Sequence, residues 1–213
     1  MTLLALSLIA SLANELQQQR SISLQASLSG APRLGLGMAA LGRPLGYSGY
    51  IGLADEPAGS LTIEQMQERC VERGQHHAGT MLELAYSLGL RFFDCARSYG
   101  RAEEYMASWL ASRREMMPHR TSECSLVIAS KWGYEYSADW RVKVCEGKFE
   151  VQKHSVEQLE RQLGETRALL PGVSLYQIHS ATRSTGVLQN DAVLDALAHL
   201  RDEQVIVISH ALL

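Results

Sequence analysis

LVIASK, at residues 126–131, is an apolar run that ends in a lysine. Its length and its polar flanks are typical of a buried β-strand. Similar short segments occur at residues 33–37, 91–94, 174–178 and 205–208, and longer segments with helical spacing lie between them. This alternation predicts a parallel sheet whose strands are joined by crossover helices.

Four helices are expected from the spacing of apolar residues, at about 75–88, 102–110, 155–170 and 191–200. Gly89 follows the first helix where a C-terminal cap belongs. Ser155 and Gln158 form a capping-box pattern at the start of the third, and Asp191 is expected to cap the fourth. Residues 42–60 are rich in Gly and Pro, which predicts a long irregular loop.

The strand–helix unit recurs about every 40 residues, which fits a (β/α) barrel. A complete barrel has eight units and about 250 residues, and about five units are recognisable here. We therefore expect an α/β fold, a partial TIM (β/α)8 barrel, with an N-terminal extension at 1–31 that is disordered or used for targeting and a truncated barrel domain at 32–213. The first and fifth strands of such a sheet have open edges, which predicts self-association.

Composition indicates a soluble domain that binds a small molecule. The chain has 213 residues, 46% of them hydrophobic and 20% charged, with a formal net charge of -3. No clustered Lys/Arg run is present, which argues against binding to nucleic acid or to an anionic membrane. The apolar run at 3–13 is too short to span a membrane. A cytoplasmic location is expected, with an organelle transit peptide as the alternative because residues 17–30 are rich in Ser and Gln.

Titratable residues follow three of the predicted strands. Asp94, Lys131 and His179 each end a strand, and Tyr99 lies in the loop after Asp94. In (β/α) barrels the C-terminal strand ends meet at one rim, where catalytic residues collect. A cation near a tyrosine lowers the pKa of the phenol from about 10 toward neutrality, and a buried ammonium needs a carboxylate partner. With a histidine to orient a carbonyl oxygen, these residues suit proton donation during carbonyl reduction by hydride.

These segments resemble the aldo-keto reductase family, in its N-terminal half. FFDCARSYG at 92–100, ASK at 129–131 and YQIH at 176–179 match the family's motifs around the aspartate and tyrosine, the lysine and the histidine. The intervals of 5, 32 and 48 residues between Asp94, Tyr99, Lys131 and His179 agree with the family's order. Residues 33–41 are similar to the family's first strand.

The resemblance implies an oxidoreductase that uses NADPH, or NADH, to reduce a carbonyl or sugar substrate. The subgroup that oxidises aldoses is also possible. By the resemblance, Tyr99 is the general acid within the tetrad with Asp94, Lys131 and His179. Met38 and Asp94 are expected to contact the cofactor, and His179 and Trp132 the substrate, where Trp132 opens a loop that also carries Tyr134 and Tyr136. Packing of these aromatic residues against the rim is an equal alternative.

Two other functions stay open. Most cofactor contacts in the family lie beyond the fourth strand, so the chain is alternatively an inactive truncated fragment or an interaction partner. A strand-end lysine in a (β/α) barrel is also the nucleophile of Schiff-base aldolases, which gives Lys131 a second possible role. No metal site is expected, because His76 and His77 are adjacent and diverge on a helix and no C-x-x-C pair occurs.

Overall fold

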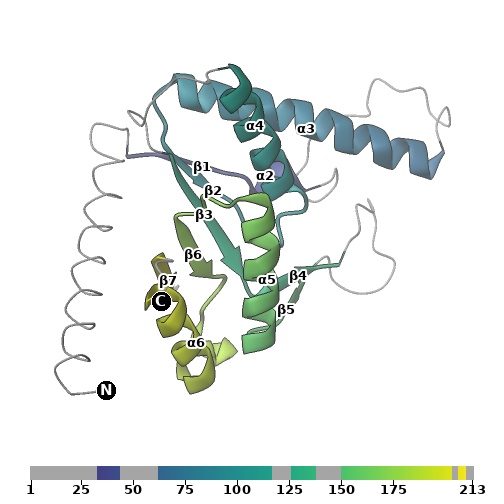
Figure 1. The fold of residues 1–213 in the computed structure, drawn as a ribbon. Helices are drawn as coiled ribbons and strands as arrows, with labels where there is room; N and C mark the ends of the chain where they lie inside the picture. The colour runs from purple at the N-terminus through teal and green to yellow at the C-terminus, as the bar shows by residue number, and fades with distance from the viewer. Residues whose placement is uncertain (1–32, 44–61, 117–125, 138–149, 203–205, 210–213) are drawn as a thin grey trace.

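The computed structural model describes residues 33–43, 62–116, 126–137, 150–202 and 206–209 (Figure 1). The strands are β1 (Gly35–Gly37), β2 (Phe92–Asp94), β3 (Val127–Trp132), β4 (Tyr134–Tyr136), β5 (Glu150–Gln152), β6 (Leu175–Ile178) and β7 (Ile206–Ser209). The α-helices are α2 (Ala39–Gly42), α3 (Ile63–Ser87), α4 (Ala102–Met116), α5 (Val156–Leu169) and α6 (Asp191–Asp202). Two 3₁₀ turns, η1 (Arg183–Thr185) and η2 (Val187–Gln189), precede α6.

A five-stranded sheet organises the fold, with the order β1-β2-β3-β6-β7. Every neighbouring pair in it is parallel. Consecutive barrel strands are therefore neighbours in space, as crossover connections require. The predicted partial (β/α) barrel with five parallel strands is confirmed. The extension predicted at 1–31 and most of the loop predicted at 42–60 lie outside the described residues.

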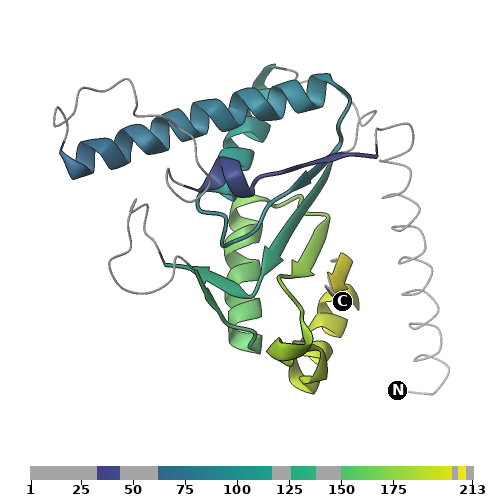
Figure 2. The same ribbon diagram turned by 180° about the vertical axis from the view of Figure 1, so that it is seen from behind.

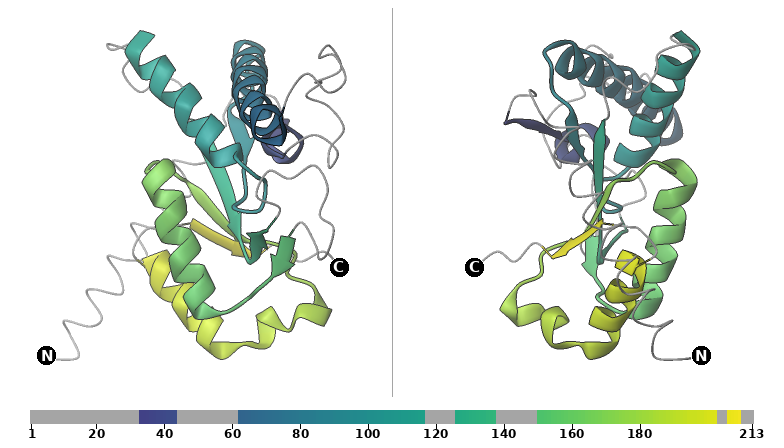
Figure 3. Two further views of the ribbon diagram at one scale, coloured as in Figure 1. Left: turned by 90° about the vertical axis from the view of Figure 1, so that its right-hand side faces the viewer. Right: turned by 60° about the vertical axis from the view of Figure 1, so that its left-hand side comes forward.

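The crossover helices lie on one face of the sheet. Helix α5 stands in front of the strands in Figure 1 and behind them in the reversed view of Figure 2. Figure 3 shows α4, α5 and α6 along the same side, with α3 across the end near α4. One cluster of buried residues joins α3 and α4 to β2, and a second joins α5 and α6 to β3 and β6.

Helix α3 begins twelve residues before its predicted start. Thr62 caps it: its side chain accepts a hydrogen bond from the backbone of Gln65, whose side chain accepts one from the backbone of Thr62. The first turns of α3 are largely exposed, but Ile63, Met66, Cys70 and Val71 recur at helical spacing, and Thr62 with Gln65 three residues later is a capping-box pattern. The prediction of a start at about residue 75 was wrong because it left these signals out.

Two smaller predictions also need correction. Asn190, rather than Asp191, caps α6, since its Oδ1 accepts a hydrogen bond from the backbone of Val193 at 3.3 Å. The aromatic segment after Lys131 is not wholly a loop, because β4 and β5 pair as an antiparallel ribbon. Gly133 makes the turn from β3 into β4 with φ 110°, and a Cβ there would lie 2.3 Å from the His154 ring.

No helix in the described part of the chain is long and apolar enough to cross a membrane. Within the same residues, no group of three or more His, Cys, Asp or Glu side chains is arranged to hold a metal ion.

Candidate active site

The strand ends bring three of the predicted residues to one edge of the sheet. β2 ends at Asp94, β3 reaches Lys131 one residue before its end, and His179 follows β6 directly. The backbone amide of His179 donates to the carbonyl of Trp132 at 2.8 Å, which continues the ladder between β3 and β6 past the strand. Parallel register thus places these side chains on neighbouring strands.

Lys131 is the centre of the polar contacts. Its Nζ donates to Oδ2 of Asp94 at 2.5 Å, to the carbonyl of Cys95 at 3.0 Å and to the phenol oxygen of Tyr99 at 3.3 Å. The side chains of Lys131 and Asp94 are 12% and 25% exposed. An ammonium with three acceptors and a carboxylate counter-charge is stable in such a partly buried place.

Tyr99 is held by the loop that follows β2. The backbone amide of Arg97 donates to the carbonyl of Lys131 at 3.1 Å, and that of Tyr99 donates to Ala96 at 3.0 Å. The ring of Tyr99 meets that of His179 edge to face, with centroids 5.4 Å apart. All four tetrad positions are therefore within one cluster of contacts.

His179 is a neutral imidazole at neutral pH. Burial lowers the pKa of His179 to about 4, helped by the positive charges of Lys131 and Arg43. A neutral imidazole has one N–H donor and one acceptor nitrogen. Nδ1 lies 3.4 Å from the hydroxyl of Ser98, so Nε2 is the nitrogen left for a substrate oxygen. The group suits orientation of a carbonyl rather than donation of a proton.

The neighbours of His179 come from the segment after β3. The Nε2 of His154 donates to the carbonyl of His179 at 2.9 Å, and burial lowers the pKa of His154. The ring of Tyr134 lies 4.9 Å from that of His179, between centroids. The hydroxyl of Tyr134 accepts a hydrogen bond from Gln152 on β5 at 3.1 Å. The β4–β5 ribbon thus brings an aromatic side chain to the histidine.

Two residues predicted to bind ligands are buried in the structure. Trp132 has no exposed surface and lies in the core cluster of α5 and α6, where its ring contacts that of His154. Met38 is also fully buried, and its backbone amide donates to the carbonyl of Asp94 at 2.8 Å. Their roles in binding substrate and cofactor stay predictions, and neither placement lends them support.

A carboxylate in the helix after the Asp94–Tyr99 motif, to which the sequence assigned no role, is buried beside the site. Glu103, 2% exposed, accepts hydrogen bonds from Arg97 at 2.5 Å, Ser130 at 2.6 Å and Thr166 at 2.8 Å. These donors belong to the loop after β2, to β3 and to α5, so Glu103 joins three elements behind Lys131. Glu103 lies three residues after Gly100 in the helix start, where acidic residues are ordinary, and nothing in the sequence marks it as buried.

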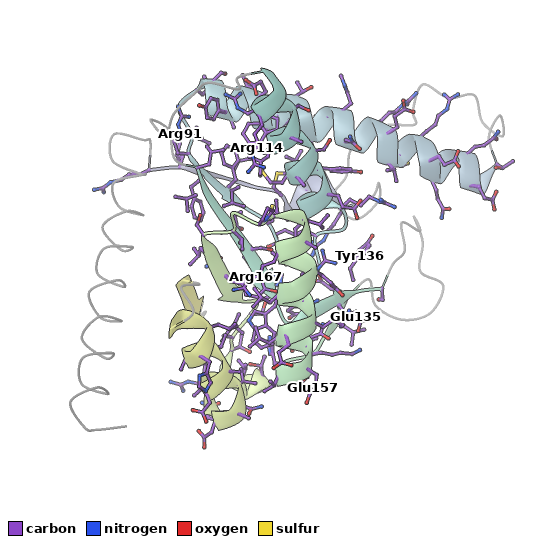
Figure 4. The ribbon with its side chains drawn as sticks, viewed as in Figure 1. Arg91, Arg114, Glu135, Tyr136, Glu157 and Arg167 are labelled. Carbon is purple, nitrogen blue, oxygen red and sulfur yellow. The ribbon has the colours of Figure 1, made fainter. Side chains whose placement is uncertain are left out.

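Arg43, immediately after α2, was also missed. Its guanidinium carbon lies 4.9 Å from the centroid of the Tyr99 ring. Its Nε donates to the carbonyl of Ser98 at 3.3 Å, and its Nη2 pairs with Glu150 of β5 at 2.8 Å. The side chains of Glu135 and Tyr136, on the adjacent β4, extend beside α5 (Figure 4). The ribbon thus contributes both an aromatic and an acidic group near the strand ends.

Cys95 lies between Asp94 and Tyr99 in the chain and is fully buried. Burial raises the pKa of the Cys95 thiol well above its usual value, with further contributions from the nearby carboxylates. A thiol that stays protonated is a poor nucleophile, and Cys95 serves the site through its backbone carbonyl.

Comparisons with known proteins identify the family and the fold of the chain. The family model described as "Aldo/keto reductase family" matches residues 67–206. No curated protein matches the chain. A solved structure from Pseudomonas aeruginosa, assigned as an aldo-keto reductase, is 24% identical with a TM-score of 0.55, over 85% of this chain and 56% of that one.

A second solved structure, an aldo-keto reductase from Bacillus halodurans in its holo form, is 17% identical with a TM-score of 0.50. The match covers 84% of this chain and 46% of that one. At these identities the likeness shows the fold alone. The chain spans about half the length of the solved structures that it matches.

Proposed function

The chain belongs to the aldo/keto reductase family, and on that premise we propose that its strand ends form the proton-donating site of a nicotinamide-dependent carbonyl oxidoreductase. The observation that carries the proposal is the position of Lys131 Nζ, which contacts the phenol of Tyr99 and the carboxylate of Asp94 together. NADPH is the proposed cofactor, with NADH as the alternative.

Tyr99 is the proposed general acid. When a carbonyl is reduced, its oxygen becomes negative and takes a proton, so the O–H bond of Tyr99 breaks and a new O–H bond forms on the substrate. The phenolate that remains is 3.3 Å from an ammonium, which stabilises the charge directly. The reverse sequence, with Tyr99 phenolate as the base, serves oxidation of an aldose.

Asp94 and His179 complete the arrangement. Asp94 pairs with Nζ of Lys131 at 2.5 Å and so holds that group beside the phenol of Tyr99. His179 offers a neutral N–H that orients the substrate oxygen toward Tyr99 without competing as an acid. Two donors of different kinds on one oxygen favour the transition state over the ground state, because the oxygen is more negative there.

The residues fit the proton half of a reaction whose other half is a nicotinamide. A reduced nicotinamide, when bound, supplies the two electrons to the carbonyl carbon. Asp94, whose side chain is 25% exposed, is the residue that we propose contacts it. Met38 is fully buried, so it would contribute only indirectly, through the hydrogen bond from its backbone amide to the carbonyl of Asp94.

A small carbonyl compound or sugar is the proposed substrate. Tyr134, rather than the buried Trp132, is an aromatic side chain that contacts His179 in addition to Tyr99. Aromatic faces suit the apolar C–H surface of a sugar ring or of an apolar carbonyl compound. The cytoplasm is the proposed location.

The Schiff-base alternative is disfavoured by the same geometry. A nucleophilic lysine has to lose its proton, whereas Asp94 at 2.5 Å stabilises the ammonium of Lys131. A second candidate function, that of an interaction partner, is favoured by the sheet, in which β1 and β7 are the terminal strands among the described residues. Self-association through those edges is the form that we propose for it.

The test is NADPH-dependent turnover of aldehydes, ketones and aldoses by the purified full chain, with Tyr99→Phe as the control. Binding is followed by quenching of tryptophan fluorescence and by a thermal-shift scan. We expect saturable binding and turnover that Tyr99→Phe abolishes. Saturable binding with equal turnover in both proteins would refute Tyr99 as the acid. Absence of binding, together with dimers or larger species in light scattering, would support the interaction role instead.

A further inference from the structure

We propose that Arg43 is a positioning residue for Tyr99, additional to the tetrad. Its guanidinium stabilises the negative charge that remains on the phenol after proton transfer, and the carboxylate of Glu150 weakens this electrostatic effect. The inference rests on the proposed function, because it assigns a further group to that reaction. Nothing in the family match covers it, since the match begins at residue 67.

The geometry places two cations over one ring. The guanidinium carbon of Arg43 lies 4.9 Å from the Tyr99 ring centroid, and Nζ of Lys131 lies 4.7 Å from it. A cation over a tyrosine ring is attracted to its π-face, and the attraction grows when the ring carries the negative charge of a phenolate. The Arg43 side chain is 10% exposed, so solvent screens this interaction only weakly.

Close packing of two glycines places Arg43 at the ring of Tyr99. Gly42 packs so closely on the loop after β2 that a Cβ would lie 2.1 Å from the Tyr99 carbonyl. Gly100, with φ 60°, is equally close to the Gly42 carbonyl, which accepts a hydrogen bond from the backbone of Arg101 at 2.8 Å. Two glycines in contact thus join α2 to the loop that carries Tyr99, and the residue after Gly42 reaches its ring.

In the part of the chain that the structure describes, a carbonyl and a carboxylate hold the guanidinium in that position. The buried Ser98 offers its carbonyl to Nε, and Glu150 pairs with Nη2. The two differ in effect, because the carbonyl is neutral while the carboxylate opposes the positive charge. Glu150 thereby couples the β4–β5 ribbon to the electrostatics of Tyr99.

Among the described residues, two cations lie against the Tyr99 ring. Lys131 of β3, paired with Asp94 of β2, lies on one side, and Arg43, paired with Glu150 of β5, supplies the second cation. The imidazole of His179, after β6, also contacts the ring and is neutral at pH 7. His179 also senses the field of Arg43, which is among the causes that depress its pKa. The pKa of His179 therefore reports on the charge of Arg43 without requiring enzymatic turnover.

The experiment compares Arg43→Gln, Arg43→Lys and Glu150→Gln in the full chain. Two quantities are measured: kcat for NADPH-dependent reduction, and the midpoint of the His179 imidazole titration by NMR, assigned with His179→Gln. In Arg43→Gln we expect kcat to fall about tenfold and the midpoint to rise by roughly half a pH unit. Arg43→Lys, which keeps the charge, should retain most of both values.

Glu150→Gln supplies the sharper test, because it breaks the same ion pair from the other side. Loss of its negative charge strengthens the field of Arg43, so kcat should stay level or rise and the midpoint should fall. If Arg43→Gln and Glu150→Gln change both quantities in the same direction, or change neither, the pair is only a structural tie and the proposal is overturned. A wild-type chain without turnover, but with opposite shifts of the midpoint, would refute the proposed function while leaving the placement of Arg43 supported.

Discussion

Two regions of the molecule place a cation between a carboxylate and an aromatic ring. In the helix pair α3–α4, Arg113 donates to both carboxylate oxygens of Glu83, at 2.6 and 2.5 Å, and its guanidinium carbon lies 3.7 Å from the centroid of the Tyr86 ring. At the strand ends, Lys131 holds Asp94 at 2.5 Å and lies 4.7 Å from the centroid of the Tyr99 ring. The chemical components are nearly the same.

Their surroundings separate them. The helix-pair cluster borders a groove of about 1290 Å³ on the outer layer, where the Glu83 side chain is 51% exposed. The two cations are equally buried, but the carboxylate of the strand-end cluster is only 25% exposed, and its cation contacts the phenol oxygen itself, at 3.3 Å. Arg113 is a guanidinium that never loses its proton and has both carboxylate oxygens as partners, so it ties two helices together. The position of the cluster at the strand ends, rather than the kinds of residue in it, indicates a catalytic role.

The largest expected effect comes from removing the phenol. Tyr99→Phe keeps the ring beside Lys131 but loses the proton, so turnover should fall about 10²–10⁴-fold with little change in thermal stability. Turnover is measured by cofactor absorbance. Tyr86→Phe, in the helix-pair cluster, is the matched control and should leave the rate unchanged; comparable losses in both variants would break the comparison.

Loss of the buried Glu103 should chiefly cost stability. In Glu103→Ala, Arg97, Ser130 and Thr166 lose their shared acceptor, and Arg97 keeps its ion pair with the more exposed Glu165 at 3.0 Å. We expect about 3 kcal/mol less free energy of unfolding in urea titrations. The neighbouring Glu104→Ala, at a side chain that is 46% exposed, should lose less than about 1 kcal/mol. Equal losses in both would show that Glu103 carries no special network.

His179 should make stability depend on pH. Its pKa is about 4 in the folded chain, below the ordinary value of 6.5, so the unfolded chain binds a proton more readily. Its contribution is therefore complete above about pH 6.5 and is lost as the pH falls from 6.5 toward 4. The loss is on the order of 1–3 kcal/mol.

Chemical denaturation at several pH values between 7 and 4, for wild type and His179→Gln, measures this contribution. The free energy of unfolding should depend less steeply on pH in the variant. The other titratable groups are common to both proteins, so their contributions cancel when the two slopes are compared. Identical slopes would mean that His179 titrates alike in the folded and unfolded states.

The smallest effect is expected at the helix pair. Glu83→Gln weakens the pair with Arg113 but leaves the packing of Tyr86 and Trp109, so the free energy of unfolding should fall by about 0.5 kcal/mol and by less at high salt. Bonding to Arg113 lowers the pKa of Glu83, so the contribution is present above the ordinary pKa of a glutamate and is lost as the pH falls through the lowered value. A salt-independent loss of several kcal/mol would place this cluster among the buried ones.

Most of the fold was predictable because it follows local patterns. Strands such as 126–130 and helices such as α4 and α5 bury one continuous face, so their apolar residues recur in the sequence with the period of a strand or a helix. The start of α3 was also marked in the sequence, by the Thr62–Gln65 cap and by Ile63, Met66, Cys70 and Val71 at helical spacing, and the prediction overlooked it. By contrast, β4 was missed because its pairing with β5 depends on residues 14–18 positions away. Cross-strand pairing of that kind is a tertiary contact, and propensity alone does not specify it.

By itself, the sequence determined the alternation of strands and helices and the spacing that places Asp94, Tyr99, Lys131 and His179 at the strand ends, because both follow from periodicity along the chain. Only the tertiary structure revealed that Trp132 is buried, that Tyr134 meets His179, and that Glu103 and Arg43 lie beside the site. Those features depend on which elements approach one another, and close approach is set by packing, such as the contact of Gly42 with Gly100, rather than by any local pattern.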